Sequence, residues 1–391
     1  MVAKSARIIA IVVGLVAVTA AVILLSRNKD DASTADDAPA VVEEDETPAS
    51  EPLHEDKRVV SDHMRRELLA RAHVWRRPRV PISSARFDNL NLDALSCKFK
   101  VTDVGGTTPK FDCALETGQK ARIKYGNGAE IPAEAAATRL LRVLGFGADE
   151  VTLVRQLRCY GCPAEPFAVL KAVEFTRAEP LYERIVDFDE TENFEWVAYE
   201  RKLNARPVET DRLEGWAFFE LDSVDPKKGG APRAHVDALR LMATLIAHWD
   251  NKSENQRLVC LDREWPKDAP CARPFLLLQD VGATFGPRKV DLDEWEQTPI
   301  WEDRKACRVS MHQLPHGGAT FIPSVISEPG RRFLGGLLAQ LSDRQLTELF
   351  VSARFDQKRG IFAATTPVEE WVRVFKAKIA AISDGPACPA A

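Results

Sequence analysis

The stretch HWDNKSEN, residues 248–255, places polar side chains between two apolar runs of the chain. The run before it repeats apolar residues at helical spacing, and the run after it begins at Leu258. Buried polar groups are costly unless they are paired, so this stretch is not ordinary core. It is either a solvated surface loop or a loop that carries chemistry, and the residues around it decide between the two.

Five of the eight residues match, in register, the catalytic loop HRDLKPEN of protein kinases, namely His248, Asp250, Lys252, Glu254 and Asn255. The resemblance implies that Asp250 orients an acceptor hydroxyl and takes its proton, and that Lys252 stabilises charge on the transferred group. It also implies that Asn255 holds a metal ion. Phosphoryl transfer needs a carboxylate near the hydroxyl, cations on the phosphates and oxygen ligands for Mg²⁺, which are the residue types present.

A second match lies downstream, where FLLLQDVG ends in Asp280-Val281-Gly282. Kinases carry the motif DFG at this place, and its Asp binds metal. A carboxylate at the end of a buried strand, followed by Gly, suits a metal ligand facing a cleft. Asp-x-Gly turns are common in any fold, so this match is informative only because it follows HWDNKSEN in the order that kinases show.

Two further matches lie upstream. The stretch ARIKYG places Lys124 where kinases have VAIK, and the helical stretch PAEAAATRLL offers Glu134 as its ion-pair partner, with Glu130 as the alternative. The turn VGGTTPKF resembles the short phosphate-covering loop of HipA-like kinases. It implies phosphate binding by Lys110 and by the backbone of four residues, Gly105, Gly106, Thr107 and Thr108.

These four matches occur in the expected order between residues 101 and 286 and resemble the protein-kinase-like superfamily. The likeness is nearer to its atypical branches, HipA-like, phosphoinositide-kinase-like and secretory-pathway kinases. It implies an α+β bilobal fold with a small β-rich N-lobe and a larger helical C-lobe, with ATP and Mg²⁺ or Mn²⁺ as cofactors. Trp249 replaces the Arg of HRD that would bind an activation-loop phosphate, so control by such phosphorylation is not expected. Val281 replaces the Phe of DFG.

The chain divides by composition into an anchor at 1–25, an acidic, Pro-containing linker at 26–55 and a globular remainder. We expect an N-terminal helix and a β-rich lobe at 56–176, and a helical lobe at 177–391. Short runs separated by turn residues predict strands, including VTLVRQL and FAVLKAVEF, and the runs QRLVCL and PFLLLQDVG predict a hairpin.

The N-terminal segment carries an uncharged run at 8–25, long enough as a helix to span roughly 27 Å. The alternatives are a cleaved signal peptide and a buried helix, and we favour an uncleaved membrane anchor. Lys4 and Arg7 precede the run, which predicts a cytoplasmic N-terminus and a globular domain outside the cytoplasm.

The eight cysteines agree with an oxidising location. Their spacing predicts bridges Cys97–Cys113, Cys159–Cys162 and Cys260–Cys271, which leaves Cys307 with Cys388. The alternatives are reduced thiols and, for CYGC, half of a zinc site.

Together these features predict a membrane-anchored, extracytoplasmic kinase that transfers phosphate to a protein, glycan, lipid or small molecule. The alternatives are an inactive kinase-fold binding module and a tethered envelope scaffold. The net charge of −5 gives no reason to expect nucleic acid as a partner.

Overall fold

The computed structural model describes residues 57–88, 90–262, 264–266, 269–315, 317–357 and 365–389. All of them belong to one compact unit that spans Pro52–Ala391. The unit is a mixed α/β fold, as the sequence predicts, and it has two large hydrophobic cores. Predicted features at residues 1–55 lie outside the described residues.

A closed five-stranded barrel holds one of these cores. Its strand order is β2-β3-β4-β7-β6, with bounds Leu92–Lys100, Lys110–Leu115, Lys120–Lys124, Thr191–Arg201 and Glu150–Tyr160 respectively. Alternating apolar residues point inward, as expected of half-buried strands. Phe111 lies at the centre, with its ring centroid 5.4 Å from that of Phe194 and 5.7 Å from that of Tyr125.

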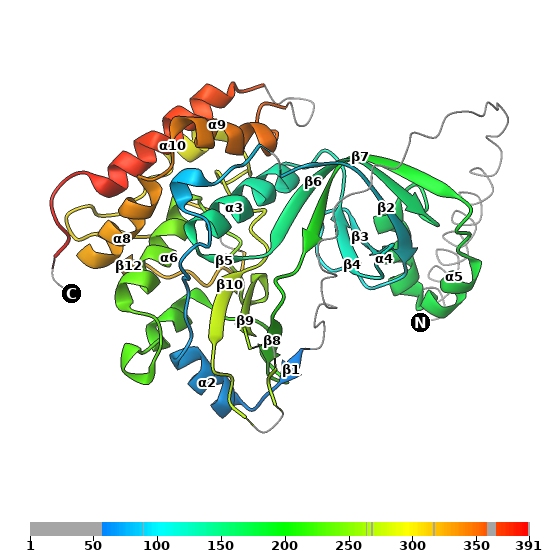
Figure 1. Cartoon of the computed structure of the whole chain (residues 1–391), viewed down its shortest axis with the longest axis horizontal. Helices are drawn as coiled ribbons and strands as arrows, with labels where there is room; N and C mark the ends of the chain where they lie inside the picture. The colour runs from blue at the N-terminus through cyan, green and yellow to red at the C-terminus, as the bar shows by residue number, and fades with distance from the viewer. Residues whose placement is uncertain are drawn as a thin grey trace, which may run out of the picture. The chain divides into compact units, whose positions relative to one another are not determined.

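A second sheet lies to the left of the barrel and lower in Figure 1, in the order β1-β8-β9-β10-β5. The strands are Arg58–Val59, Arg206–Glu209, Gln256–Cys260, Pro274–Leu278 and Gly147–Ala148. The predicted hairpin is confirmed, because β9 and β10 pair antiparallel. The short β5 pairs in parallel with the end of β10, with Leu278 opposite Ala148. This pairing places β5, and with it the C-terminal end of α3, beside β10.

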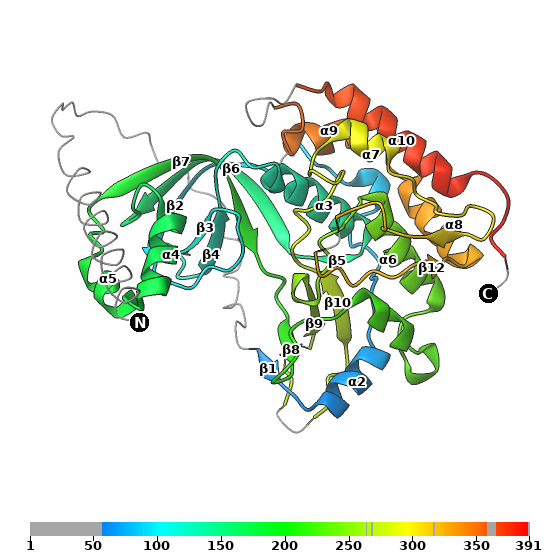
Figure 2. The ribbon, with the colours of Figure 1, turned by 180° about the vertical axis from the view of Figure 1, so that it is seen from behind.

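Amphipathic helices build the larger core. They are α3 (Glu130–Leu144), α6 (Arg233–Leu245), α7 (Leu292–Gln297), α8 (Glu328–Leu338), α9 (Asp343–Ser352) and α10 (Val368–Ser383). Ser342 caps α9, because its side chain accepts from the Gln345 backbone N–H. Figures 1 and 2 both show α3 between the barrel and the group formed by α8, α9 and α10.

The remaining elements are shorter. They are α2 (Asp62–Ala70), α4 (Pro166–Thr176), α5 (Glu179–Ile185), β11 (Arg308–Val309), β12 (Ser324–Val325) and the 3-10 turns η1 (Ile82–Ser84), η2 (Phe218–Ser223), η3 (Pro226–Lys228) and η4 (Ser253–Asn255).

Three details differ from the sequence prediction. The stretch FAVLKAVEF was expected as a strand, but it forms α4, which packs on the barrel through Leu170. A short apolar run does not distinguish strand from helix, whereas Pro166 in the first turn was a helix signal. The strand-rich part also extends past residue 176, because β7 closes the barrel between β4 and β6. The N-terminal helix α2 packs with the larger core through Leu68 and Leu69 rather than with the barrel.

All four predicted disulfides are present. Cys97 and Cys113 are diagonal rather than directly opposite, because Cys97 pairs in register with Leu115. The Cys260–Cys271 bridge closes the β9–β10 hairpin, and Cys307–Cys388 ties the C-terminal segment to the loop before β11. Their Cα–Cα distances of 5.5–5.9 Å suit the bond.

Within the described residues, no helix has both the length and the apolar character needed to cross a bilayer. The predicted anchor at 8–25 falls outside those residues and stays a prediction.

Candidate active site

Lys124, at the end of β4, is the centre of the candidate site. Its Nζ lies 2.8 Å from both carboxylate oxygens of Glu134 on α3. It also lies 3.5 Å from Oδ1 of Asp280 and 3.9 Å from Oε1 of Glu130. The side chains of Lys124 and Glu134 are almost fully buried, at 2% and 1% exposure, so neither finds water as a substitute partner. We refer to Lys124, Glu134 and Asp280 as the lysine centre.

The protonation of this centre follows from its geometry. Burial opposes the charged form of Lys124, but Glu134 and Asp280 outweigh it and raise the lysine pKa well above its usual value. Burial raises the pKa of Glu134, and Lys124 opposes that rise. We describe Lys124 and Glu134 as an ion pair, because the ammonium contacts both oxygens at the same short distance.

Asp280 follows β10 and is the exposed member of the centre, with 37% of its side chain accessible. Burial of the surrounding region opposes its ionisation, yet Lys124 and Lys110 lower its pKa to about 2, so it is a carboxylate at neutral pH. Position 282, two residues after Asp280, requires glycine, because a Cβ there would lie 2.2 Å from Cγ of Glu130.

The stretch 248–255 lies beside this centre and is not a freely solvated loop. The Asn255 carbonyl accepts from the backbone N–H groups of Gln279 and Asp280, at 2.9 and 3.2 Å. The Asn255 side-chain Nδ2 donates to the Asp250 carbonyl at 2.6 Å. Lys252 Nζ lies 3.1 Å from the Asp250 carboxylate, which is 31% exposed. The loop therefore presents an accessible carboxylate and is bonded to the segment that carries Asp280.

His248 begins the loop and is fully buried. Within the described part of the chain neither ring nitrogen has a hydrogen-bond partner. Burial lowers its pKa to about 4, so the imidazole is neutral at neutral pH, although Asp280 and Asp250 favour its charged form.

Asn255 and Asp280 offer the oxygen atoms that a divalent ion requires. The amide of Asn255 is oriented by its bond to Asp250, and no hydrogen bond among the described residues occupies its Oδ1. Asp280 supplies an ionised, partly exposed carboxylate. The donor set therefore fits Mg²⁺ or Mn²⁺.

The turn between β2 and β3 brings a second lysine to the site. Lys110 pairs in register with Lys124 across β3 and β4, so both side chains lie on the same face. Burial, and then repulsion by Lys124, lower the pKa of Lys110, while Asp280 opposes the change. Gly105, Gly106 and Thr107 are exposed, Thr108 is half-buried, and Gly106 adopts a positive φ of 74°. The backbone of this turn is accessible to a ligand.

A cavity of about 310 Å³ adjoins the site. Its lining includes Gln279, which precedes Asp280, and Leu203 of the connector that joins β7 to β8. Its walls also carry paired charges. Arg122 donates to both oxygens of Asp112 at 2.8 and 3.1 Å, and Lys202 pairs with Glu200 and with Asp149.

Sequence reasoning missed Asn251, which lies inside the loop. It is fully buried and donates to the His248 carbonyl at 2.8 Å. Its Oδ1 accepts from the backbone N–H groups of Thr320 and Phe321, at 2.7 and 2.8 Å. No local pattern connects residue 251 with residues 320 and 321, so only the fold reveals this anchor.

No family model and no curated protein matches the chain. Two solved structures resemble it at low identity. The Helicobacter pylori proinflammatory kinase CtkA has a TM-score of 0.41 and 10% identity, covering 75% of this chain and 96% of that one. The Golgi casein kinase with Mn/ADP bound has a TM-score of 0.35 and 14% identity, covering 75% and 74%.

Proposed function

We propose that this chain is a kinase-like phosphotransferase that moves the γ-phosphoryl group of ATP to an acceptor hydroxyl. One observation carries the proposal: Lys124 lies between Glu134 at 2.8 Å and Asp280 at 3.5 Å, and the backbone N–H of Asp280 donates to the Asn255 carbonyl. Residues from three of the four stretches that resemble kinase motifs thus meet in one place. A solvated loop or a chance Asp-x-Gly turn gives no reason for that meeting.

Asp250 is the proposed hydroxyl-orienting base. As the acceptor oxygen bonds to the γ-phosphorus, its proton passes to the Asp250 carboxylate. The bond from that phosphorus to the bridging oxygen breaks, and ADP leaves with the electron pair. Lys252, in contact with Asp250 at 3.1 Å, stabilises charge on the transferred group.

The phosphates would be held by Lys124, by Lys110 and by backbone N–H groups at Gly105, Gly106, Thr107 and Thr108. Asn255 and Asp280 would hold Mg²⁺ or Mn²⁺, which neutralises phosphate charge and aligns the transferred group when bound. Glu134 positions Lys124 and has no direct contact with the substrate in this scheme.

The proposed location is outside the cytoplasm, with residues 8–25 as a single-pass anchor and the N-terminus cytoplasmic. Four disulfides within the described residues support an oxidising compartment. The charge pattern at Lys4 and Arg7 supports the orientation. The acceptor can be a protein, glycan, lipid or small molecule.

A second candidate, a binding module without catalysis, is favoured by the cavity next to the site. Ligand pockets are mostly apolar, with a few placed polar groups. Here Arg122, Asp112, Glu200 and Lys202 line the cavity and already pair with one another. A nucleotide base that enters the cavity must pack against these ion pairs, because breaking an ion pair leaves a buried charge without its partner.

The test separates binding from transfer in the full-length chain held in a neutral detergent. Titration calorimetry with a non-hydrolysable ATP analogue and Mn²⁺ measures binding, and ADP release with ATP measures transfer. We expect Asp280→Ala to weaken metal-dependent binding about 100-fold, since it removes a charged metal ligand. Asp250→Ala should keep binding and lose transfer. The control is Asp211→Ala, which removes an exposed aspartate and should change neither.

If the wild-type chain binds the analogue without releasing ADP from ATP, the binding module is the better description. If Asp280→Ala binds as tightly as wild type, the proposed metal site is wrong.

A further inference from the structure

A larger cavity, of about 570 Å³, lies on the other side of the connector between β7 and β8. Five separate parts of the chain build it: residues 76–79, the segment from the last turn of α3 to β5, the connector at Leu203 and Asn204, Leu261 just after β9, and Arg273 just before β10. Leu203 lines this cavity and the one beside the candidate active site. We call it the arginine cavity.

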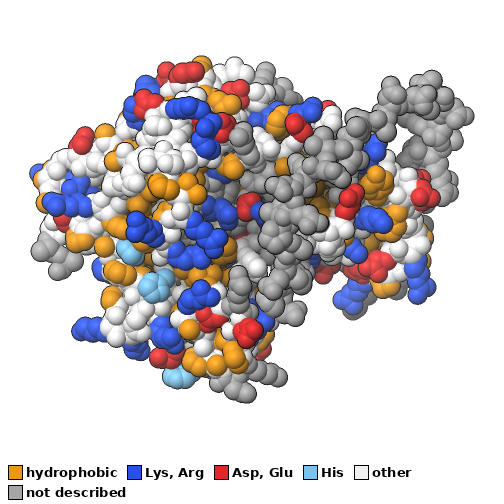
Figure 3. Space-filling model, in the orientation of Figure 1, with side chains coloured by type: hydrophobic (Ala, Val, Ile, Leu, Met, Phe, Trp, Pro, Cys, Tyr) orange, Lys and Arg blue, Asp and Glu red, His pale blue; other side chains and the backbone are white. Residues whose placement is uncertain are grey.

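Arginine dominates its lining, with Arg76, Arg77, Arg79, Arg142 and Arg273. No acidic side chain is among the lining residues. Figure 3 shows the same excess, with Lys and Arg side chains gathered over the region where Figure 1 labels β5 and β10.

Part of this positive charge is uncompensated. Arg142 has a carboxylate partner in Glu150, at 3.1 Å, and Arg273 has one in Asp262, at 2.9 Å. Among the described residues no ion pair reaches Arg76, Arg77 or Arg79. Burial, and then repulsion from Arg79, Arg273 and Arg142, lower the pKa of Arg76, so these cations act on one another.

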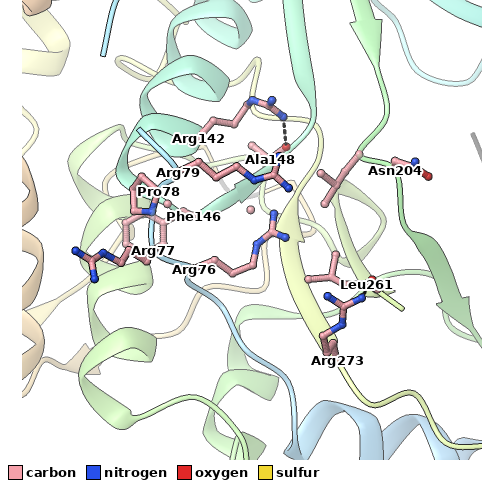
Figure 4. A pocket seen from close by; sticks show the side chains of 13 residues that line it. Arg76, Arg77, Pro78, Arg79, Arg142, Phe146, Ala148, Asn204, Leu261 and Arg273 are labelled. Atoms are coloured by element: carbon pink, nitrogen blue, oxygen red, sulfur yellow. Dashed lines mark hydrogen bonds between the residues drawn. The ribbon is translucent and has the colours of Figure 1, made fainter. Parts of the chain in front are cut away.

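The side chains also share a direction. Figure 4 shows Arg76, Arg79, Arg142 and Arg273 extending toward one open space, bounded on its far side by Leu261 and Asn204. Arg77 contributes to the lining, but its guanidinium extends away from the other four. Arg76 is braced, because its guanidinium lies 5.0 Å from the centroid of the Phe275 ring. Arg142 is braced by a hydrogen bond of 3.5 Å to the Ala148 carbonyl.

The planar guanidinium matches phosphate oxygens in pairs, and several guanidiniums without carboxylates favour a ligand with several negative charges. The volume of the cavity falls in the range of small-molecule sites, and a concave site with walls at Phe146 and Leu261 suits a compact ligand. We propose that the arginine cavity binds a compact molecule that carries two or more phosphate groups, either free in solution or as a lipid headgroup. This site is separate from the proposed ATP site and does not rest on the proposed function.

Inositol hexakisphosphate is a suitable probe, because it carries phosphates without a nucleotide base. Calorimetry with the full-length chain in neutral detergent should show one site, with affinity that falls as salt rises. We expect Arg76→Ala with Arg79→Ala to weaken binding at least about tenfold, since charge-assisted bonds are lost. Arg77→Ala removes one cation from the same loop, so it is the matched control for the single Arg79→Ala variant, and it should bind within about threefold of wild type.

Vesicles distinguish the two sources. If the chain binds phosphatidylcholine vesicles that contain a bisphosphorylated phosphoinositide, and inositol hexakisphosphate displaces it from them, the ligand is a lipid headgroup. If the chain binds inositol hexakisphosphate but does not bind these vesicles, the ligand is a free molecule. Should the double variant fail to fold, the single Arg79→Ala variant, whose side chain is exposed, serves instead.

The proposal is overturned if neither probe binds, or if the double variant and Arg77→Ala weaken binding equally. Asp280→Ala should leave binding of inositol hexakisphosphate unchanged. A failure of the proposed ATP site is therefore distinguishable from a failure of this one.

Discussion

The lysine centre and the arginine cavity lie near each other in the fold and treat charge in opposite ways. In the centre, Lys124 is shared by Glu134 at 2.8 Å and Asp280 at 3.5 Å, and burial strengthens those attractions. In the cavity, Arg76, Arg77 and Arg79 have no ion pair within the described residues, and the side chains stay exposed. The buried, matched cluster joins parts of the fold, whereas we propose that a ligand completes the exposed, unmatched cluster.

The largest effect on stability should come from breaking the matched cluster. Lys124→Met leaves Glu134 buried without a cation and next to Asp280. We expect the free energy of unfolding to fall by about 3–5 kcal/mol, as for other broken buried pairs. Urea denaturation followed by circular dichroism measures it.

Lys120→Met is the control, because it makes the same change on the same strand at a lysine whose side chain is 42% exposed and pairs with Asp112 at 3.3 Å. Its cost should stay below about 1 kcal/mol. Equal costs for the two variants would show that the lysine centre contributes nothing special to the fold.

A second prediction concerns His248, whose charge the fold suppresses. Its pKa is about 4 in the folded chain against 6.5 in the unfolded chain. Between these values the unfolded chain binds a proton that the folded chain does not, so stability falls as pH drops from 6.5 to 4. The loss that is due to His248 should reach about 3 kcal/mol.

His248→Asn should reduce the slope of stability against pH in that window. Phe218→Leu alters a ring whose centroid is 6.2 Å from that of His248 and keeps the imidazole, so its slope should match wild type. Denaturant titrations at several pH values provide the comparison. An unchanged slope in His248→Asn means that another group sets the pH dependence.

The smallest effect on the free energy of unfolding should come from a change in the arginine cavity, and this change should stabilise the fold rather than destabilise it. Arg79→Ala removes a cation that repels Arg76 and has no ion pair among the described residues. Without ligand, we expect the free energy of unfolding to be unchanged or to rise by up to about 0.5 kcal/mol at low salt. The increase should vanish in high salt. A fall of more than about 1 kcal/mol would instead show that Arg79 has an internal role.

The two regions also differ in what the sequence could reveal. The residues of the candidate active site were identifiable because each occupies a motif with its own spacing, as with Asp250 and Asn255 in HWDNKSEN. The β9–β10 hairpin and α3 were predictable from turn residues and helical periodicity. The structure then supplies the meeting of Lys124, Glu134 and Asp280.

The arginine cavity had no such signal. Arg79, Arg142 and Arg273 are far apart in sequence, and each looks like an ordinary surface arginine. Parallel pairing of β5 with β10 brings the end of α3 to that place, and pairing across such a distance has no local pattern. The boundary at residue 176 was misplaced for the same reason, because β7 joins the barrel through long-range pairing with β4.

The most direct measurement of the central claim is electron paramagnetic resonance of Mn²⁺ bound with ATP to the full-length chain. A Mn²⁺ ion held by Asn255 and Asp280 and by phosphate oxygens should show hyperfine coupling to ³¹P. We predict that this coupling is present in wild type and in Asp250→Ala, and lost in Asp280→Ala. If Asp280→Ala retains the coupling and the affinity of wild type, Asp280 is not a metal ligand, and the proposed active site is contradicted.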